Sequence, residues 1–165
     1  MRYYTALTIA GSDSCGGAGI QADIKTISAL GVYAASAITA ITVQNTKGVY
    51  GIQKVEPEIV KGQIEAVMDD NHPDAIKIGM VNDTDTIHAI AETLAKYKGK
   101  YQYLIIDPVM VSTSGSRLMQ EDALYTFVKE LLPLATLLTP NIPEAEILAG
   151  IKIQNADDIK AAAAA

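Results

Sequence analysis

The sequence is poor in the groups that secreted, membrane-bound and nucleic-acid-binding proteins use. Its 165 residues include one cysteine, Cys15, and two arginines, Arg2 and Arg117, and its net charge is −6. A single cysteine excludes an internal disulfide and fits a reducing compartment. A nucleic-acid surface would need clustered positive charge. There is no apolar run of 18 residues and no signal-peptide pattern at the N-terminus. We therefore expect a cytoplasmic protein with no membrane segment and no nucleic-acid partner.

Short apolar segments alternate with amphipathic ones along the whole chain. Strands are expected at residues 5–10, 33–43, 75–78, 103–106 and 137–139, with a further edge strand or hairpin arm at 49–55. Helices are expected at 20–30, from Pro57, from Asn82 or Asp83, at 120–132, and from Pro143 to Gly150. This alternation predicts an α/β fold, with a mostly parallel sheet and helices on both faces. At this length we expect a single domain, residues 1–165.

The first strand runs into a loop with four glycines, two serines and an aspartate, residues 11–19. Glycines let a backbone approach a ligand closely. The loop leads into a helix N-terminus, where N–H groups and the helix dipole favour an anion or polar ligand. Asp23 is expected in about the first turn of that helix, facing the same opening. A tight strand-to-helix connection would need only one glycine, so the pattern favours a binding loop.

Two common loop motifs fit poorly. A phosphate loop of nucleoside triphosphatases ends in Gly-Lys-Ser/Thr, whereas Gly19 is followed by Ile20 and Gln21. Residues 17–22 match the G-x-G-x-x-A form of the dinucleotide fingerprint. That fold also needs an acidic residue near the end of the second strand, and residues 24–55 contain no Asp or Glu. A dinucleotide-dependent oxidoreductase is therefore a weak alternative.

Polar and unusual residues follow each expected strand. Because ligands bind beyond the carboxyl ends of parallel strands, these residues form one candidate site. They are the loop at 11–19 with Asp23, Gln44, Met80, Asp107, Asn141 and Glu144. The structural alternatives are a helix cap for Asp23, Asn141 and Glu144, a turn for Gln44 and Asp107, and core packing for Met80. A carboxylate at a strand end, such as Asp107, also suits a metal ion.

Five segments in this order resemble a known enzyme family. They are Ile-Ala-Gly-Ser-Asp-Ser-Cys-Gly-Gly-Ala-Gly-Ile-Gln-Ala-Asp at 9–23, Ala-Ile-Thr-Val-Gln-Asn-Thr at 40–46, Lys-Ile-Gly-Met at 77–80, Asp-Pro-Val-Met at 107–110 and Thr-Pro-Asn-Ile-Pro-Glu-Ala-Glu at 139–146. Together they resemble the hydroxymethylpyrimidine/phosphomethylpyrimidine kinases of thiamine biosynthesis, which have the ribokinase-like fold. The resemblance covers residues 7–150.

The resemblance implies phosphoryl transfer from ATP, with Mg²⁺, to the hydroxymethyl group of an aminopyrimidine and then to its monophosphate. It places Gly11, Asp23, Gln44, Met80 and Val109 around the pyrimidine. It also places Asn141 and Glu144 at the nucleotide, and Asp107 and Glu144 at the metal. The side-chain amide of Gln44 is both donor and acceptor, which suits an aminopyrimidine edge. Family members are often dimers, so a homodimer is one expected assembly.

The chain departs from the family pattern in two places. Cys15 stands where serine is more usual, a small change that we expect to be tolerated. The family's later Gly-x-Gly motif, which forms an anion hole and supplies the catalytic base, has no match after Gly150. The resemblance therefore implies that the C-terminal part of the fold is missing, that the catalytic residue lies beyond Ala165, and that this stretch alone is inactive. A base contributes about 10²–10⁴-fold to a rate.

Two alternative functions are also compatible with these motifs. Pyridoxine or pyridoxal kinases share the fold and the reaction. A non-catalytic pyrimidine-binding module would account for the absence of an identifiable base.

Overall fold

A computed structural model describes residues 3–81, 83–110, 119 and 121–165. Its main sheet has the strand order β2-β1-β5-β6-β7, and every neighbouring pair is parallel. The strands are β1 (Thr5–Ala10), β2 (Tyr33–Ile38), β5 (Ala75–Ile78), β6 (Tyr103–Ile106) and β7 (Leu137–Leu138). The predicted α/β class with a mostly parallel sheet is confirmed.

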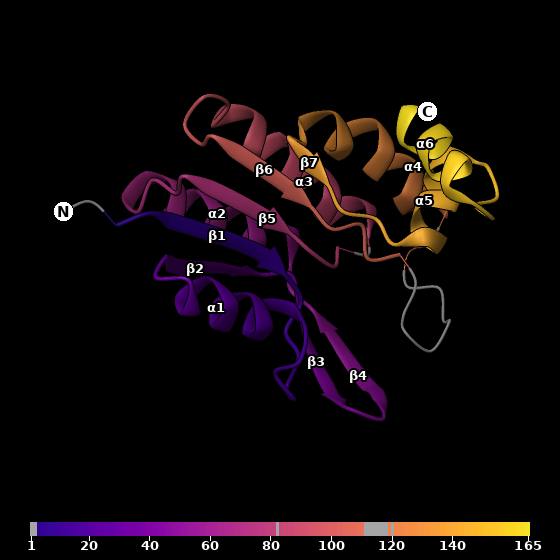
Figure 1. Cartoon of the computed structure of the whole chain (residues 1–165). Coiled ribbons are helices and arrows are strands. Elements are labelled where there is room, and N and C mark those ends of the chain that lie inside the picture. The colour runs from indigo at the N-terminus through magenta and orange to yellow at the C-terminus, as the bar shows by residue number, and fades with distance from the viewer. Residues whose placement is uncertain (1–2, 82, 111–118, 120) are drawn as a thin grey trace.

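Helices lie on both faces of the sheet, as predicted (Figure 1). Helix α1 (Gly19–Ala29) contacts β1 and β2 on one face, whereas α2 (Pro57–Asp70) and α3 (Thr84–Lys96) pack side by side on the other. The single helix expected at 120–132 is instead α4 (Glu121–Thr126) followed by a π-helical turn, η1 (Phe127–Leu131), and a short 3₁₀ helix, η2 (Leu132–Leu134). The chain then forms α5 (Ile142–Ala149) and α6 (Ala156–Ala164).

The main core lies between the sheet and the layer of α2, α3 and η1. Strand side chains alternate between faces, so one set from each strand points into this layer. The fully buried members include Leu7, Ile9, Ile76, Ile78, Leu104 and Ile106 from the strands and Ile64, Ile87, Ile90 and Leu94 from the helices. The strand residues between these positions, such as Thr8 and Lys77, face α1 and form part of the site described below.

The strand expected at 33–43 is wrong in its extent. Strand β2 ends at Ile38, and Ala40–Asn45 forms β3, which pairs antiparallel with β4 (Gly48–Lys54) in a separate two-stranded sheet. The change of direction is fixed at Thr39, whose N–H donates to Ala10 O and whose hydroxyl donates to Met80 O. The segment at 49–55 is thus a hairpin arm, one of the two alternatives expected. In Figure 1 the hairpin projects from the carboxyl edge of the sheet.

The chain order reverses between β1 and β5. From β1 the chain moves outward to β2, and it returns to place β5 on the other side of β1. Such a switch point leaves a crevice at the carboxyl edge, because the two connections leave in opposite directions. No helix among the described residues is long and apolar enough to span a bilayer.

Candidate functional site

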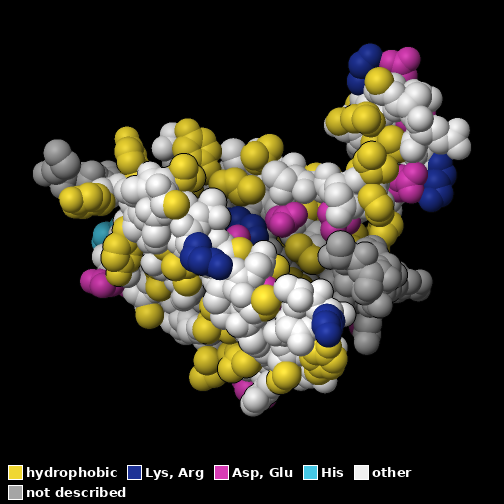
Figure 2. Space-filling view, turned by 60° about the horizontal axis from the view of Figure 1, so that its bottom comes forward, with side chains coloured by type: hydrophobic (Ala, Val, Ile, Leu, Met, Phe, Trp, Pro, Cys, Tyr) yellow, Lys and Arg dark blue, Asp and Glu magenta, His cyan; other side chains and the backbone are white. Residues whose placement is uncertain are grey.

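A pocket of about 360 Å³ lies at this switch point, bounded by the carboxyl ends of β1, β5 and β6 and by the hairpin. Its lining includes all five residues that the sequence analysis places at the substrate: Gly11, Asp23, Gln44, Met80 and Val109. Asp107, expected at the metal, lines the same pocket. Figure 2 shows acidic and basic side chains close together in a recess of this face, among apolar ones.

The floor of the pocket carries a partly buried polar cluster that joins both strands at the switch point to α1. Thr8 and Lys77 are direct neighbours in the register of β1 and β5, and both are on the face toward α1. Asp23 of α1 contacts both: its carboxylate accepts from Thr8 Oγ1 at 2.6 Å and from Lys77 Nζ at 3.1 and 3.2 Å. Asp23 does not cap α1, because Ala18 occupies the cap position and Asp23 lies in the second turn.

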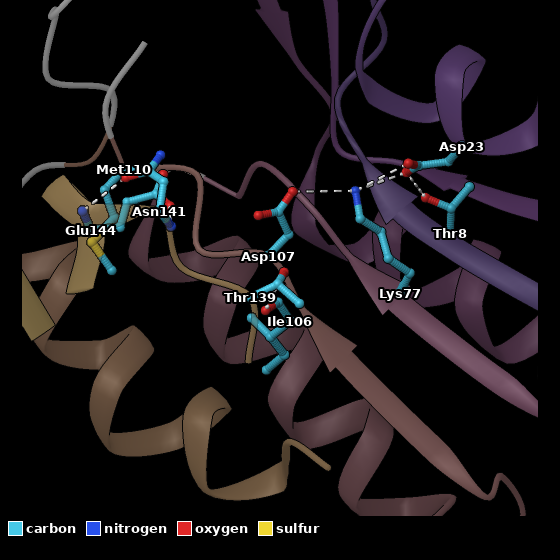
Figure 3. Close-up of polar contacts among 9 residues, drawn as sticks. All are labelled: Thr8, Asp23, Lys77, Ile106, Asp107, Met110, Thr139, Asn141 and Glu144. Atoms are coloured by element: carbon cyan, nitrogen blue, oxygen red, sulfur yellow. Dashed lines mark hydrogen bonds and ion pairs between the residues drawn. The ribbon is translucent and has the colours of Figure 1, made fainter. Parts of the chain in front are cut away.

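Lys77 also links the two acidic sides of the pocket. Its Nζ lies 3.8 Å from Asp107 Oδ2, at the end of β6. In Figure 3 Asp107 lies between the Asp23–Lys77 pair on one side and Asn141 with Glu144 on the other. A Cβ atom at Gly79 would lie 3.0 Å from Lys77 Nζ and 3.1 Å from Ala10 Cβ, so glycine at this position leaves room for the ammonium group.

Part of the glycine-rich loop is held together by one of its own side chains. The buried carboxylate of Asp13 accepts from the N–H groups of Cys15, Gly17 and Ala18, each at 2.9 Å. In the first turn of α1, the N–H of Ile20 donates to Gly11 O. The Asp13 carboxylate therefore organises the loop just before α1, whereas no side chain caps the helix itself.

The two loop serines hold the hairpin. Ser12 Oγ accepts from the N–H of Thr42 at 3.0 Å, and Ser14 Oγ donates to Thr42 O. Ser14 Oγ also accepts from the N–H of Gln44. The serines, counted as ligand groups in the sequence analysis, thus make structural contacts that bring β3 to the pocket.

Gln44 reaches the site from the hairpin and not from the edge of the main sheet. In β3 the inward residues are Ala40 and Thr42, and Ile41 and Val43 point outward. The register shifts between Val43 and Gln44, and Gln44 lines the pocket. Its Oε1 lies 3.3 Å from Thr42 Oγ1, whose hydroxyl makes its shorter bond to Ser12 O at 2.8 Å.

Close approach at the apolar wall depends on glycines at two positions. A Cβ atom at Gly11 would lie 2.8 Å from Met80 Cε. Gly19 has φ +56°, and a Cβ atom there would collide with Gly11 O. These contacts pack the first and last residues of the loop against each other and set the position of the loop above the pocket.

Asn141 and Glu144 form a capping box at the N-terminus of α5, the structural alternative noted for them. Asn141 Oδ1 accepts from the N–H of Glu144 at 3.0 Å, and Glu144 Oε2 accepts from the N–H of Asn141 at 2.9 Å. Glu144 Oε1 accepts from the N–H of Met110 at 3.4 Å, and the side chain is buried. Neither residue lines the pocket itself.

The donors present suit Mg²⁺ only in a water-rich site. Among the described residues no three His, Cys, Asp or Glu side chains are grouped as metal ligands. The Asp107 side chain is 39% exposed and can contribute an oxygen, whereas both Glu144 oxygens already accept backbone N–H groups. Mg²⁺ commonly keeps several waters and uses one or two carboxylates plus substrate phosphates. Asp107 therefore fits a direct ligand, and Glu144 fits contact through water.

Sequence reasoning missed three members of the site: Thr8, Lys77 and Asp13. A lysine and a threonine on short buried strands were a detectable signal for Thr8 and Lys77, because alternation places them opposite the core residues. Asp13 was seen only as part of a polar loop. Cys15 is exposed, His72 lies in the loop after α2, and His88 lies on the surface of α3.

Comparison with known proteins identifies the family. The family model described as phosphomethylpyrimidine kinase matches residues 13–165. The hydroxymethylpyrimidine/phosphomethylpyrimidine kinase of Rhizobium meliloti is 56% identical over 88% of this chain and 53% of its own length. That of Bacillus subtilis is 47% identical over 99% of this chain and 59% of its own length. The chain thus spans little more than half the length of these relatives.

Solved structures agree with this result. The phosphomethylpyrimidine kinase of Clostridium difficile 630 has a TM-score of 0.91 and 55% identity, covering 96% of this chain and 68% of that one. A pyridoxal kinase of Staphylococcus aureus, solved with AMP-PCP and pyridoxal, has a TM-score of 0.85 and 34% identity, covering 99% of this chain and 58% of that one. The chain belongs to the phosphomethylpyrimidine kinase family.

Proposed function

We propose that the protein containing this chain phosphorylates 4-amino-5-hydroxymethyl-2-methylpyrimidine and its monophosphate from ATP, in thiamine biosynthesis. The observation that carries the proposal is the convergence of Gly11, Asp23, Gln44, Met80 and Val109 on one pocket at the switch point. Residues 1–165 would form one ribokinase-like domain or part of it, in a cytoplasmic enzyme. The catalytic base stays a prediction for residues beyond Ala165.

The pocket can bind an aminopyrimidine through complementary groups. The Gln44 amide lines the pocket and provides both a donor group and an acceptor. Met80 provides a polarisable apolar surface beside Gly11 for a flat ring. Asp23, fixed by Thr8 and Lys77, is an acceptor for a substrate hydroxyl or amino group. These residues orient the alcohol, and alignment with charge neutralisation is what phosphoryl transfer needs most.

ATP and Mg²⁺ are part of the proposal. When bound, Mg²⁺ would neutralise charge on the phosphates. Asp107 would hold it directly, and Asn141 and Glu144 would lie on the nucleotide side, with Glu144 acting through water. The capping box keeps the Glu144 carboxylate fixed, so its position does not depend on the ligand.

A homodimer is also proposed, on the surface of the hairpin. The outward side chains of Ile41, Val43 and Tyr50 are 53%, 63% and 65% exposed. Three large apolar side chains on a projecting two-stranded ribbon favour association, because a second copy would remove them from water.

The experiment is calorimetric binding of the hydroxymethylpyrimidine to the chain, with Gln44→Leu and a matched Gln53→Leu control. Gln53 is exposed on β4 and does not line the pocket. Gln44→Leu should weaken binding at least about 10-fold, because the polar edge of the ligand loses both partners. Gln53→Leu should bind as the wild type does. ATP-dependent phosphorylation is then assayed with the full-length protein. Equal binding by both variants would contradict the assignment of Gln44.

Pyridoxal phosphorylation is the second candidate, favoured by the structural likeness to a pyridoxal kinase. The greater identity to the pyrimidine kinases favours the pyrimidine as the main acceptor. Measuring kcat/KM for the two alcohols with the full-length protein separates the candidates. A higher value for pyridoxal would reverse our ranking.

A further inference from the structure

Lys77 provides the positive charge in a pocket whose other charged lining residues, as far as the structure describes them, are acidic. Among the described lining residues it is the only Lys, Arg or His, whereas Asp13, Asp23 and Asp107 are all acidic. The carboxylate of Asp13 is turned to the N–H groups of its own loop. A ligand in the pocket therefore faces three charged groups, the Lys77 ammonium and the carboxylates of Asp23 and Asp107. Their formal charges sum to −1.

The ammonium group can reach a ligand. The Lys77 side chain is 28% exposed, and the absence of a side chain at Gly79 leaves space beside Nζ. A lysine ammonium has three donors. The two hydrogen bonds to Asp23 use at most two of them, and Asp107 at 3.8 Å is beyond hydrogen-bonding distance.

We propose that Lys77 allows this pocket to accept an anionic, phosphorylated acceptor in addition to the neutral alcohol. This inference rests on the proposed function and deepens it. The second acceptor carries a phosphate of about −1.5 to −2 charge at pH 7, whereas the first is uncharged. Without Lys77 the floor would hold two carboxylates and no cation, and it would repel the phosphate. The neutral alcohol has no comparable requirement.

Lys77 also has a structural role, because it holds Asp23, and the test must separate the two. A purely structural role would change the binding of both acceptors by a similar factor. A charge role changes the ratio of their dissociation constants. The same reasoning predicts that removing a negative charge from the floor favours the phosphorylated acceptor.

The experiment measures, by calorimetry without nucleotide, the dissociation constants of the hydroxymethylpyrimidine and its monophosphate for the full-length protein. The variants are Lys77→Met, Lys77→Arg, Asp107→Asn and the double variant Lys77→Met/Asp107→Asn. Lys96→Met is the matched control. Lys96 ends α3, which runs from the carboxyl edge of the sheet back to the amino edge, far from the pocket.

Lys77→Met should weaken monophosphate binding at least about 10-fold more than alcohol binding, because unit charges a few ångströms apart interact strongly near a protein surface. Lys77→Arg should keep most of the wild-type ratio. Asp107→Asn should shift the ratio toward the monophosphate, and the double variant, with the formal sum restored to −1, should return near the wild-type ratio. Lys96→Met should match the wild type.

The outcomes distinguish the two levels of proposal. If the wild type binds both acceptors and Lys77→Met weakens both by the same factor, Lys77 is structural and this inference fails alone. If the wild type binds neither, the proposed function fails and Lys77 has no such role. Should Lys77→Met not fold, the Asp107→Asn variant decides: no shift of its ratio toward the monophosphate overturns the inference.

Discussion

Replacing Asp13 with asparagine should destabilise the fold strongly for a loop residue. The carboxylate is buried and accepts three N–H groups, with Oδ1 bound to Cys15 and Oδ2 bound to both Gly17 and Ala18. An amide has only one oxygen, so the variant loses at least one contact and turns an NH₂ group toward a backbone donor. Hydrogen bonds to a charged group contribute about 1.5–3 kcal/mol each. We therefore expect a loss of about 2–4 kcal/mol.

The assay is urea unfolding followed by circular dichroism, with Asp70→Asn as the control. Asp70 is an exposed carboxylate at the end of α2, and surface changes of this kind stay within about 0.5 kcal/mol. Asp13→Asn should lower the urea midpoint clearly while Asp70→Asn should not. A variant that unfolds within about 0.5 kcal/mol of the wild type would refute the idea that Asp13 organises the loop.

The effect should also depend on pH, in a direction that the pKa fixes. Burial alone would raise the pKa of Asp13, but the hydrogen bonds from backbone N–H groups outweigh burial, and the pKa lies below its ordinary value of 3.8. A lowered pKa in the folded state stabilises the fold above the unfolded-state pKa, and this stabilisation is lost as the pH falls through the folded value. The difference between wild type and Asp13→Asn should hold from pH ~7 to ~5 and shrink below pH ~4. A difference that does not change with pH would show that charge is not involved.

Two further predictions concern a glycine and a histidine. Gly19→Ala should lower the free energy of unfolding in urea by more than about 2 kcal/mol, because the φ of Gly19 is +56° and the new Cβ collides with the loop backbone. Gly62 is exposed inside α2, so Gly62→Ala should be neutral or stabilise by up to about 1 kcal/mol. Equal effects of the two variants would contradict the role given to Gly19. The hydrogen bond and charge of Glu130 raise the pKa of His88, so its NMR titration should lie above 6.5 and fall in Glu130→Gln. This ion pair stabilises below the unfolded-state pKa and is lost as the pH rises through the folded value; an unchanged titration in the variant would exclude the contact.

Local patterns in the sequence were sufficient for much of the fold and for most of the residues of the pocket. Alternating apolar periods predicted the parallel sheet, and Pro57, Pro143 and Gly150 marked helix ends that the structure confirms. The rule that ligands bind at the carboxyl ends of parallel strands was enough to gather Gly11, Asp23, Met80 and Asp107, whereas Val109 came from the family resemblance. These features depend on short-range periodicity or on the general geometry of parallel sheets, and both can be recognised in a linear sequence.

Only the tertiary structure decided how the polar groups pair, because their partners are distant in sequence. Thr39 ends β2 through bonds to Ala10 at the end of β1 and to Met80 just after β5, so residues 33–43 could not be divided from sequence alone. The cluster of Thr8, Asp23 and Lys77 joins positions 15 and 54 residues apart, and it exists because the strand order reverses between β1 and β5. The sequence by itself determined which groups stand at the ends of the strands. The topology decided that a lysine lies between two acidic side chains there.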